Sequence, residues 1–309
     1  MSNSIDSGVI DFHVHGFSSQ MLPTAYYRGA AGQILARQSS SKSIDEVAER
    51  IRANAIDPSG DLLFEELDAA DVQRAVIVGI DWASLSSDPE PTTHPDEHRK
   101  YFQGLVERSN GRLSAIIGVD PRRPDVEGIL QWSRELPWIV GIKLYPPTGF
   151  SVVDDVCEPV YRAAASADKL VMFHTGGQTY PFDLQYARLE QYAALQRKHP
   201  ELTIVLAHAG HPLWGPEALM VAKGHPRTYL DISGWNEEPA EVSSPFLRRC
   251  FETVGPARVL FGSDFVAGLY SRGRGHIAAW RDVYERAAVE FGVPKDELYA
   301  PAAHLLGAQ

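Results

Sequence analysis

Two histidines separated by one residue stand near the start of the chain, in the sequence Val9-Ile10-Asp11-Phe12-His13-Val14-His15-Gly16. The apolar and β-branched residues predict a short buried strand, which the glycine ends. Because alternate side chains of a strand share one face, we expect Asp11, His13 and His15 to point the same way. Two imidazoles so placed can bind one metal ion with little rearrangement. A pair of hydrogen-bonded histidines near the surface is the alternative interpretation.

Seven further apolar segments alternate with helical patterns, which is typical of a parallel sheet buried on both faces. We expect these strands at residues 74–81, 113–120, 140–145, 170–174, 203–208, 228–233 and 258–264. Eight strand–helix units in 309 residues favour an α/β fold of the (β/α)₈ (TIM) barrel type. An open doubly wound sheet would need a phosphate-binding glycine motif, and the sequence contains none. No linker divides the chain, so we predict one domain over residues 1–309.

The stretch after the first predicted strand contains two local patterns. Residues 17–42 are predicted to form a long loop insertion, a length that is usually functional or disordered in a compact domain. Ser43 and Glu46 then have the spacing of a capping box, which predicts a helix from Ser43 to Ala55.

Titratable side chains end several of the predicted strands. These strand-end residues are His13, His15, Lys143, His174, His208 and Asp264. In a barrel all strand carboxyl ends open on one face, which is where active sites lie. A buried titratable group is costly unless it is paired or ligated. Six such groups at one face therefore predict a shared metal site.

Composition excludes several classes of function. The net charge is −11 and no basic block is present, so we expect no nucleic-acid partner. No apolar run approaches about 18 residues, and the start of the chain lacks the pattern of a signal peptide, so we expect no membrane partner. The two cysteines, Cys157 and Cys250, lie far apart without CxxC spacing. We predict a soluble, reduced, cytoplasmic protein.

The strand-end residues resemble those of the amidohydrolase superfamily, and most closely those of its amidohydrolase-2 branch, which includes aminocarboxymuconate-semialdehyde decarboxylase and related lactonases. The motifs that carry the resemblance are Asp11-x-His13-x-His15, Lys143, His174, His208-Ala209-Gly210-His211-Pro212 and Gly262-Ser263-Asp264. The resemblance implies one divalent metal, zinc or else manganese, bound by His13, His15, His174 and Asp264. It also implies that His208 acts beside the metal as a general base or an electrostatic helper, and it allows a homodimer.

Three further residues near the expected site have more than one interpretation. In binuclear members of the superfamily a lysine at the position of Lys143 is carbamylated and bridges two metals, whereas here we predict one metal. Lys143 otherwise pairs with a carboxylate or attracts an anionic substrate. Asp11 is expected to fix a histidine tautomer from behind the site, or else to be a buried structural carboxylate. His211 is expected to orient the loop after the sixth strand, or to cap the turn before Pro212.

Substrate specificity in such barrels comes from the loops that follow the strands. Aromatic and arginine side chains in these loops suit a cyclic or carboxylate-bearing small molecule. The candidate substrate-binding residues are Arg28, Trp82, Tyr145, Tyr180, Trp235 and Arg272.

The expected metal site indicates which reactions the protein could catalyse. Such a metal lowers the pKa of a bound water from about 15.7 to roughly 7, and Asp264 lies where it could accept that proton. We therefore predict a metal-dependent hydrolase that acts on an amide, lactone or related C–N or C–O bond through the activated water. One alternative is non-oxidative decarboxylation of an aromatic or unsaturated carboxylic acid at the same site. A metal-binding barrel without catalysis is the second alternative.

Overall fold

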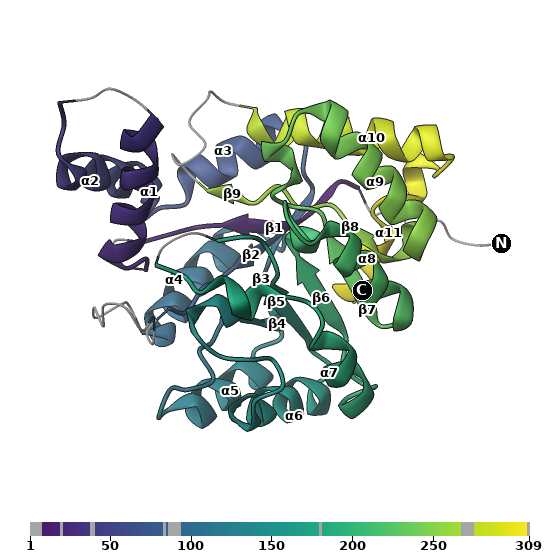
Figure 1. The fold of residues 1–309 in the computed structure, drawn as a ribbon, viewed down its shortest axis with the longest axis horizontal. Helices are drawn as coiled ribbons and strands as arrows, with labels where there is room; N and C mark the ends of the chain where they lie inside the picture. The colour runs from purple at the N-terminus through teal and green to yellow at the C-terminus, as the bar shows by residue number, and fades with distance from the viewer. Residues whose placement is uncertain are drawn as a thin grey trace.

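A parallel sheet curls around the centre of the molecule in the computed structural model, which describes residues 8–18, 21–37, 41–82, 85, 94–178, 181–266 and 275–307 (Figure 1). All neighbouring strands are parallel, in the order β8-β7-β6-β5-β4-β3-β2-β1-β9. The strands are β1 (Ile10–His15), β2 (Arg74–Val78), β3 (Leu113–Gly118), β4 (Ile139–Leu144), β5 (Leu170–His174), β6 (Ile204–Ala207), β7 (Thr228–Asp231), β8 (Val259–Leu260) and β9 (Phe265–Val266).

Two short strands, β8 and β9, together occupy the last strand position of the barrel, and they connect the two ends of the sheet. β8 pairs with β7, whereas β9 pairs with β1. Between them, the backbone N–H of Phe12 donates to the carbonyl of Phe261 at 2.8 Å, and that of Asp264 donates to the carbonyl of His13 at 2.8 Å. Backbone hydrogen bonds therefore run from β7 round to β1. The predicted single-domain (β/α)₈ barrel is confirmed.

Helices surround the sheet on its outer side, so the strands are buried on both faces as their apolar sequences require (Figure 1). The helices are α1 (Thr24–Arg37), α2 (Ile44–Ala55), α3 (Asp61–Ala69), α4 (Pro95–Arg108), α5 (Val126–Glu135), α6 (Glu158–Ser166), α7 (Tyr192–Lys198), α8 (Gly215–Gly224), α9 (Ala240–Val254), α10 (His276–Phe291) and α11 (Ala300–Leu305). No helix in the described parts of the chain combines the length and the apolar character that a membrane span requires.

The prediction of a long loop over residues 17–42 is wrong in part, because residues 24–37 form helix α1. Two glycines, Gly29 and Gly32, weaken the helical pattern of this segment, and each costs about 1 kcal/mol relative to alanine in a helix. Burial of Ala25, Tyr27 and Ala31 offsets this cost. The helix thus depends on tertiary packing that local sequence does not reveal.

Helix α2 begins as predicted. The side chain of Ser43 accepts a hydrogen bond from the backbone N–H of Glu46 at 3.2 Å, and the Glu46 carboxylate accepts one from the N–H of Ser43 at 2.7 Å. These two bonds form the expected capping box.

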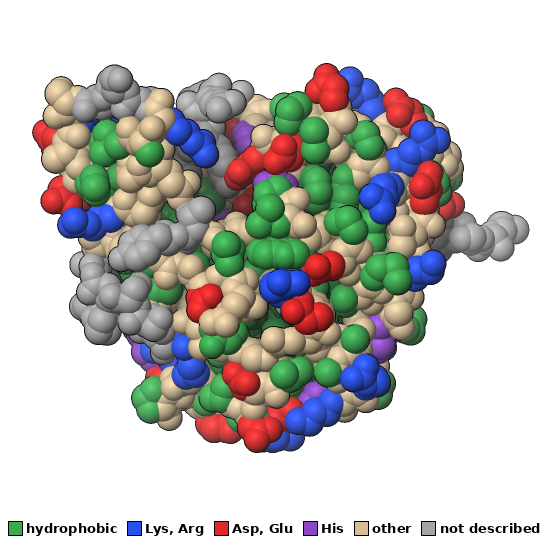
Figure 2. All heavy atoms as spheres, in the orientation of Figure 1, with side chains coloured by type: hydrophobic (Ala, Val, Ile, Leu, Met, Phe, Trp, Pro, Cys, Tyr) green, Lys and Arg blue, Asp and Glu red, His purple; other side chains and the backbone are tan. Residues whose placement is uncertain are grey.

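Helices α1 and α2, which we call the cap, pack together beside the barrel mouth. Their apolar cluster includes Met21, Tyr27 and Ala48, and it continues into the barrel through Trp82 and Tyr145. In Figure 1 and in Figure 2 the cap forms a lobe at the upper left, away from α9 and α10 at the upper right. The cap is therefore placed to form one wall of any site at the mouth.

Candidate metal centre

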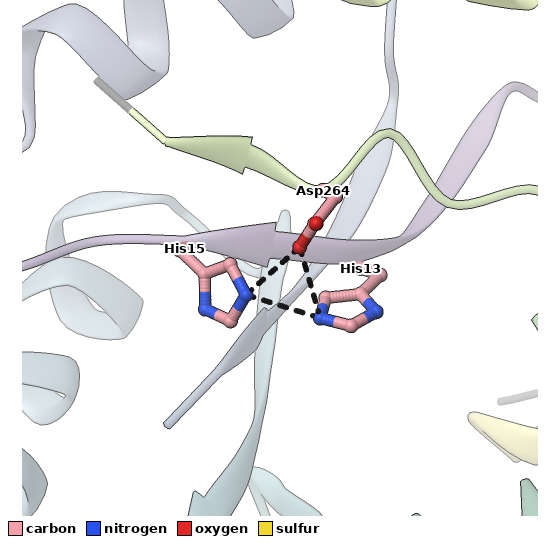
Figure 3. A group of neighbouring side chains, drawn as sticks. All are labelled: His13, His15 and Asp264. Atoms are coloured by element: carbon pink, nitrogen blue, oxygen red, sulfur yellow. Dashed lines mark hydrogen bonds and ion pairs between the residues drawn. The ribbon is translucent and has the colours of Figure 1, made fainter. Parts of the chain in front are cut away.

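Three side chains converge at the carboxyl end of β1 (Figure 3). His13 Nε2 lies 3.1 Å from His15 Nε2. Oδ1 of Asp264 lies 3.0 Å from His15 Nε2 and 3.5 Å from His13 Nε2. One atom from each residue can thus be chosen so that all three lie within 4.8 Å of one another. Two imidazoles and a carboxylate at this spacing can hold a divalent metal.

Hydrogen bonds on the far side of each ring leave the inner nitrogens free to bind a metal. Nδ1 of His15 lies 2.7 Å from the carbonyl oxygen of Val78, and Nδ1 of His13 lies 2.5 Å from Oδ2 of Asp231. Both oxygens are acceptors, so each Nδ1 carries the hydrogen and each Nε2 keeps its lone pair. Partners of this kind orient metal-binding histidines in many proteins. The residues therefore fit the predicted metal.

The prediction that Asp11 fixes a histidine tautomer is wrong. Its Oδ1 accepts hydrogen bonds from the backbone N–H groups of His13 at 3.1 Å and Ser263 at 3.0 Å, so it joins β1 to the segment between β8 and β9. Burial raises the pKa of Asp11 to about 7. The alternative of a buried structural carboxylate fits these contacts. Asp231 supplies the tautomer-fixing contact, which we did not predict, although it ends an apolar strand as His174 does.

His174 lies at the same cavity but outside the group of three. Its ring stacks on Tyr145 with centroids 4.1 Å apart and meets His208 edge-on at 4.6 Å. Burial, followed by the charge of His208, holds the pKa of His174 well below its ordinary value. Its Nε2 is buried and has no hydrogen-bond partner among the described residues. This atom is free to bind a metal, and the role of His174 as a fourth ligand stays a prediction.

Lys143 is buried in the floor of the cavity. Its Nζ has no hydrogen-bond partner within the described parts of the chain. Burial lowers its pKa to about 8, against the opposing influence of the Asp231 and Asp264 charges. The simple pair with a carboxylate is therefore not formed, and the interpretations that involve carbamylation or an anionic substrate stay open.

Asp264 and His208 have opposite electrostatic environments. Burial alone would raise the pKa of Asp264, but the nearby His208, His15 and His13 outweigh it and hold that pKa well below its ordinary value. Burial lowers the pKa of His208 to about 3. At neutral pH the site thus combines an ionised Asp264 with an uncharged His208. Both residues have left-handed backbones, with φ of 55° and 68°, a conformation that often marks functional positions.

A cavity of about 470 Å³ opens above the metal group, which is the size of a small-molecule site. Its wall on the cap side comes from one face of α1, because the residues that line it recur every three or four positions. These residues are Tyr26, Ala30, Gln33 and Arg37. Across the mouth, Glu237 and Glu238 line the cavity next to the 3₁₀ turn Trp235–Glu237. Sequence reasoning missed Arg37 and both glutamates.

Only some of the predicted substrate-binding residues line the cavity. Trp82 and Tyr145 line the cavity and lie against each other with ring centroids 5.1 Å apart. Arg28 instead forms an ion pair with Asp45 of α2 at 2.8 Å, because helix α1 turns it away from the mouth, so its prediction is wrong. Tyr180 and Arg272 lie outside the described residues.

Trp235 does not line the cavity, and its prediction as a substrate contact is wrong. Its indole stacks on Phe246 with centroids 3.6 Å apart, and its Nε1–H donates to the carbonyl of His208 at 2.9 Å. The His211 ring packs against Trp235, and His211 Nε2 lies 3.2 Å from Glu238. His211 thus joins the loop after β6 to the segment after β7, and its role in orienting that loop stays a prediction.

Comparisons with known proteins show the family of the chain. The family model described as amidohydrolase matches residues 96–297. The uncharacterised protein y4mH of Sinorhizobium fredii is 25% identical over 241 residues, which are 72% of this chain and 78% of that protein.

Two solved structures share the fold at low identity. A zinc-bound amidohydrolase from Burkholderia multivorans has a TM-score of 0.64 and 17% identity, over 96% of this chain and 98% of that chain. The 5-carboxyvanillate decarboxylase LigW from Sphingomonas paucimobilis has a TM-score of 0.63 and 15% identity, over 96% and 98% of the two chains. The family match covers most of the sequence and includes His174, His208 and Asp264. The chain belongs to the amidohydrolase family.

Proposed function

We propose that this protein is a metal-dependent hydrolase that cleaves an amide, lactone or related C–N or C–O bond in a small cyclic or carboxylated molecule. The observation that carries the proposal is the convergence of two imidazole nitrogens and the Asp264 carboxylate at the floor of a small-molecule cavity. Family membership and the zinc in the Burkholderia multivorans relative support it.

The nitrogen-rich set of ligands favours zinc, with manganese as the alternative. A divalent ion held by His13, His15, Asp264 and His174 would supply a Lewis acid and an acidified water. We infer one ion for each chain, because among the described residues only one group of ligand atoms converges in this way.

Asp264 is the proton acceptor in this proposal. Its Oδ1 belongs to the metal group, whereas its Oδ2 lies 3.9 Å from His208 Nδ1, a separation that leaves Oδ2 without a hydrogen bond to that ring. Because the carboxylate stays ionised at neutral pH, Oδ2 can take a proton from the attacking water and then give it to the leaving group.

The substrate is held in this proposal by Lys143, by His208 and by aromatic side chains of the cavity wall. The Lys143 ammonium has no partner among the described residues and can attract a carboxylate or a polarised carbonyl oxygen. The aromatic side chains that form the wall pack against a ring and exclude water from it. They are Tyr26, Trp82, Tyr145 and Phe182.

Decarboxylation is the second candidate function. Lys143 favours it, because its ammonium has no hydrogen-bond partner among the described residues and could bind the carboxylate that the substrate loses. LigW, which shares the fold, is named as a decarboxylase.

An isotope experiment separates the two functions. The zinc-loaded protein is incubated in ¹⁸O-labelled water with one panel of lactones and amides and another of aromatic carboxylic acids. We expect ¹⁸O in the product of the first panel. Release of CO₂ without ¹⁸O incorporation would refute hydrolysis and favour decarboxylation.

The matched variants are Asp264→Asn and Asp168→Asn. Both positions have left-handed backbones, with φ of 55° and 50°, and Asn tolerates that conformation. Asp168 is 98% exposed. We expect Asp264→Asn to lower kcat by about 10²-fold or more, as loss of a general base does, while Asp168→Asn leaves it unchanged.

We also infer a reducing, cytoplasmic location, which the two buried free thiols, Cys157 and Cys250, support. A homodimer stays a prediction from the family. Cell fractionation tests the location, and light scattering of the purified protein tests the dimer.

A further inference from the structure

The hydroxyl of Ser233 lies between two histidines of the site. Its Oγ is 3.1 Å from His13 Nδ1 and 3.0 Å from His208 Nδ1. The Ser233 side chain is buried, and it follows β7 two residues after Asp231. A hydroxyl has one hydrogen to donate, so the way it is shared fixes the state of both rings.

The hydrogen of Ser233 is not donated to His13. Nδ1 of His13 lies 2.5 Å from Asp231 Oδ2 and donates its own hydrogen there. A nitrogen that carries a hydrogen has no lone pair left to accept another. The Ser233 oxygen can at most accept part of the same N–H.

His208 is then the acceptor for the Ser233 hydroxyl. Among the described residues, the nearest carboxylate oxygen to His208 Nδ1 is Oδ2 of Asp264, which at 3.9 Å is too far for a hydrogen bond. The described residues offer Ser233 Oγ no third partner. If His208 Nδ1 carried a hydrogen, the buried hydroxyl would have no acceptor for its own, a loss that folded proteins avoid.

We propose that Ser233 holds His208 in the tautomer that has its hydrogen on Nε2. Because Nδ1 faces Ser233 and His208 lines the cavity, the opposite edge of the ring presents an N–H donor to the substrate. The donor binds a substrate oxygen as negative charge develops on it. His208 is then an electrostatic helper, and Asp264 alone accepts the proton. The tautomer itself does not depend on the proposed hydrolase function, whereas this catalytic role rests on it.

The backbone lies close to both edges of the His208 ring. A Cβ at Gly234 would lie 3.3 Å from His208 Nδ1, and one at Gly176 would lie 3.1 Å from its Cδ2, so these glycines let the chain approach both edges. The Nε1–H of Trp235 donates a hydrogen bond to the backbone carbonyl of His208. The space around the ring is therefore narrow, and the hydrogen bond to Ser233 is the contact that holds Nδ1 on that side.

Nuclear magnetic resonance tests the tautomer directly. Long-range ¹H–¹⁵N spectra of zinc-loaded protein labelled with ¹⁵N-histidine distinguish the two tautomers, and His208→Gln identifies the His208 signals. We expect the Nε2–H form in the wild type. Detection of the Nδ1–H form there would overturn the proposal, whatever the variants do.

Two serine variants test the cause. Ser233→Ala should shift His208 toward a mixture of tautomers, whereas Ser233→Thr, which keeps a hydroxyl, should retain Nε2–H. Ser133→Ala is the matched control, because Ser133 is also buried and, among the described residues, its hydroxyl donates only to the carbonyl of Leu130 on α5, at 2.9 Å. A His208 tautomer that is unchanged in Ser233→Ala would show that Ser233 does not set it.

The catalytic consequence has a separate measurement. Ser233→Ala should lower kcat by about tenfold, the scale of one neutral hydrogen bond, with KM and zinc content unchanged, and Ser233→Thr should restore it. An unchanged kcat beside an altered tautomer would remove His208 from the mechanism. Wild-type protein that is inactive on every substrate but shows Nε2–H would refute the hydrolase and leave the tautomer proposal standing.

Discussion

The floor of the cavity and the cap that forms its wall are built in different ways. The functional residues of the floor stand near or just after the carboxyl ends of barrel strands, and hydrogen bonds to other strands orient the imidazoles of His13 and His15. The cap is a helical pair whose position depends on an apolar cluster shared with the barrel. Strand register thus fixes the chemistry, whereas packing of side chains fixes the shape of the mouth.

Loss of a metal-binding imidazole should have the largest effect, because it removes one of the three side chains that converge on the proposed ion. We expect His13→Ala to lose its tightly bound zinc and its activity, while the fold, held by the barrel core, remains. Elemental analysis with circular dichroism measures both. His304→Ala, on the exposed surface of α11, is the control and should keep full zinc content. Full zinc content in His13→Ala would remove His13 from the ligand set.

Asp231→Asn should have the next largest effect. It keeps the size of the side chain but removes the charge that orients His13 at 2.5 Å. Substitution of such an outer partner typically costs about 10- to 100-fold in metal affinity. Competition with a zinc chelator measures the loss. An affinity equal to that of the wild type would show that the charge of Asp231 is not needed to orient His13.

The floor could be predicted from the sequence because its signal is local. A titratable residue that ends an apolar strand is visible in the chain, and barrel topology brings such residues together. His13, His15 and Asp264 were found in this way, and Asp231 carries the same signal, which we overlooked.

Helix α1 of the cap could not be predicted in the same way, although α2 was predicted from its capping box. Helix α1 contains two glycines and has neither an acidic residue in its first turn nor a strong apolar face. Its helical state comes from contacts with α2 and the barrel mouth, which are distant in sequence. Once α1 was taken for a loop, no rule could tell that Arg28 faces away from the mouth and Arg37 toward it.

His98 is a buried imidazole that does not line the cavity of the metal site. It lies on α4, and neither ring nitrogen has a hydrogen-bond partner among the described residues. Burial lowers its pKa to about 3 from an ordinary value of 6.5. Between these two pH values the unfolded chain binds a proton that the folded chain does not. Stability therefore falls as pH decreases below 6.5, by up to roughly 1.4 kcal/mol per pH unit from this residue.

Replacement of His98 by phenylalanine should weaken this pH dependence. Urea unfolding of the wild type and of His98→Phe, at pH 7.5 and pH 5, measures it. We expect the variant to lose less stability than the wild type on acidification. An equal loss in both proteins would show that His98 is not buried in its neutral form.

Substitution of Arg37 should have the smallest effect, but it tests the cap most directly. Arg28 serves as its control, because the two residues stand on opposite sides of helix α1. Arg37 lines the cavity, whereas Arg28 pairs with Asp45 on α2. If the cap wall contacts the substrate, Arg37→Ala should raise KM for a carboxylated substrate by about threefold, the scale of an exposed charge pair, without changing zinc content. Arg28→Ala should leave KM unchanged. Equal KM values for the two variants would mean that the substrate stays on the floor and that the cap shapes the mouth without contacting what enters it.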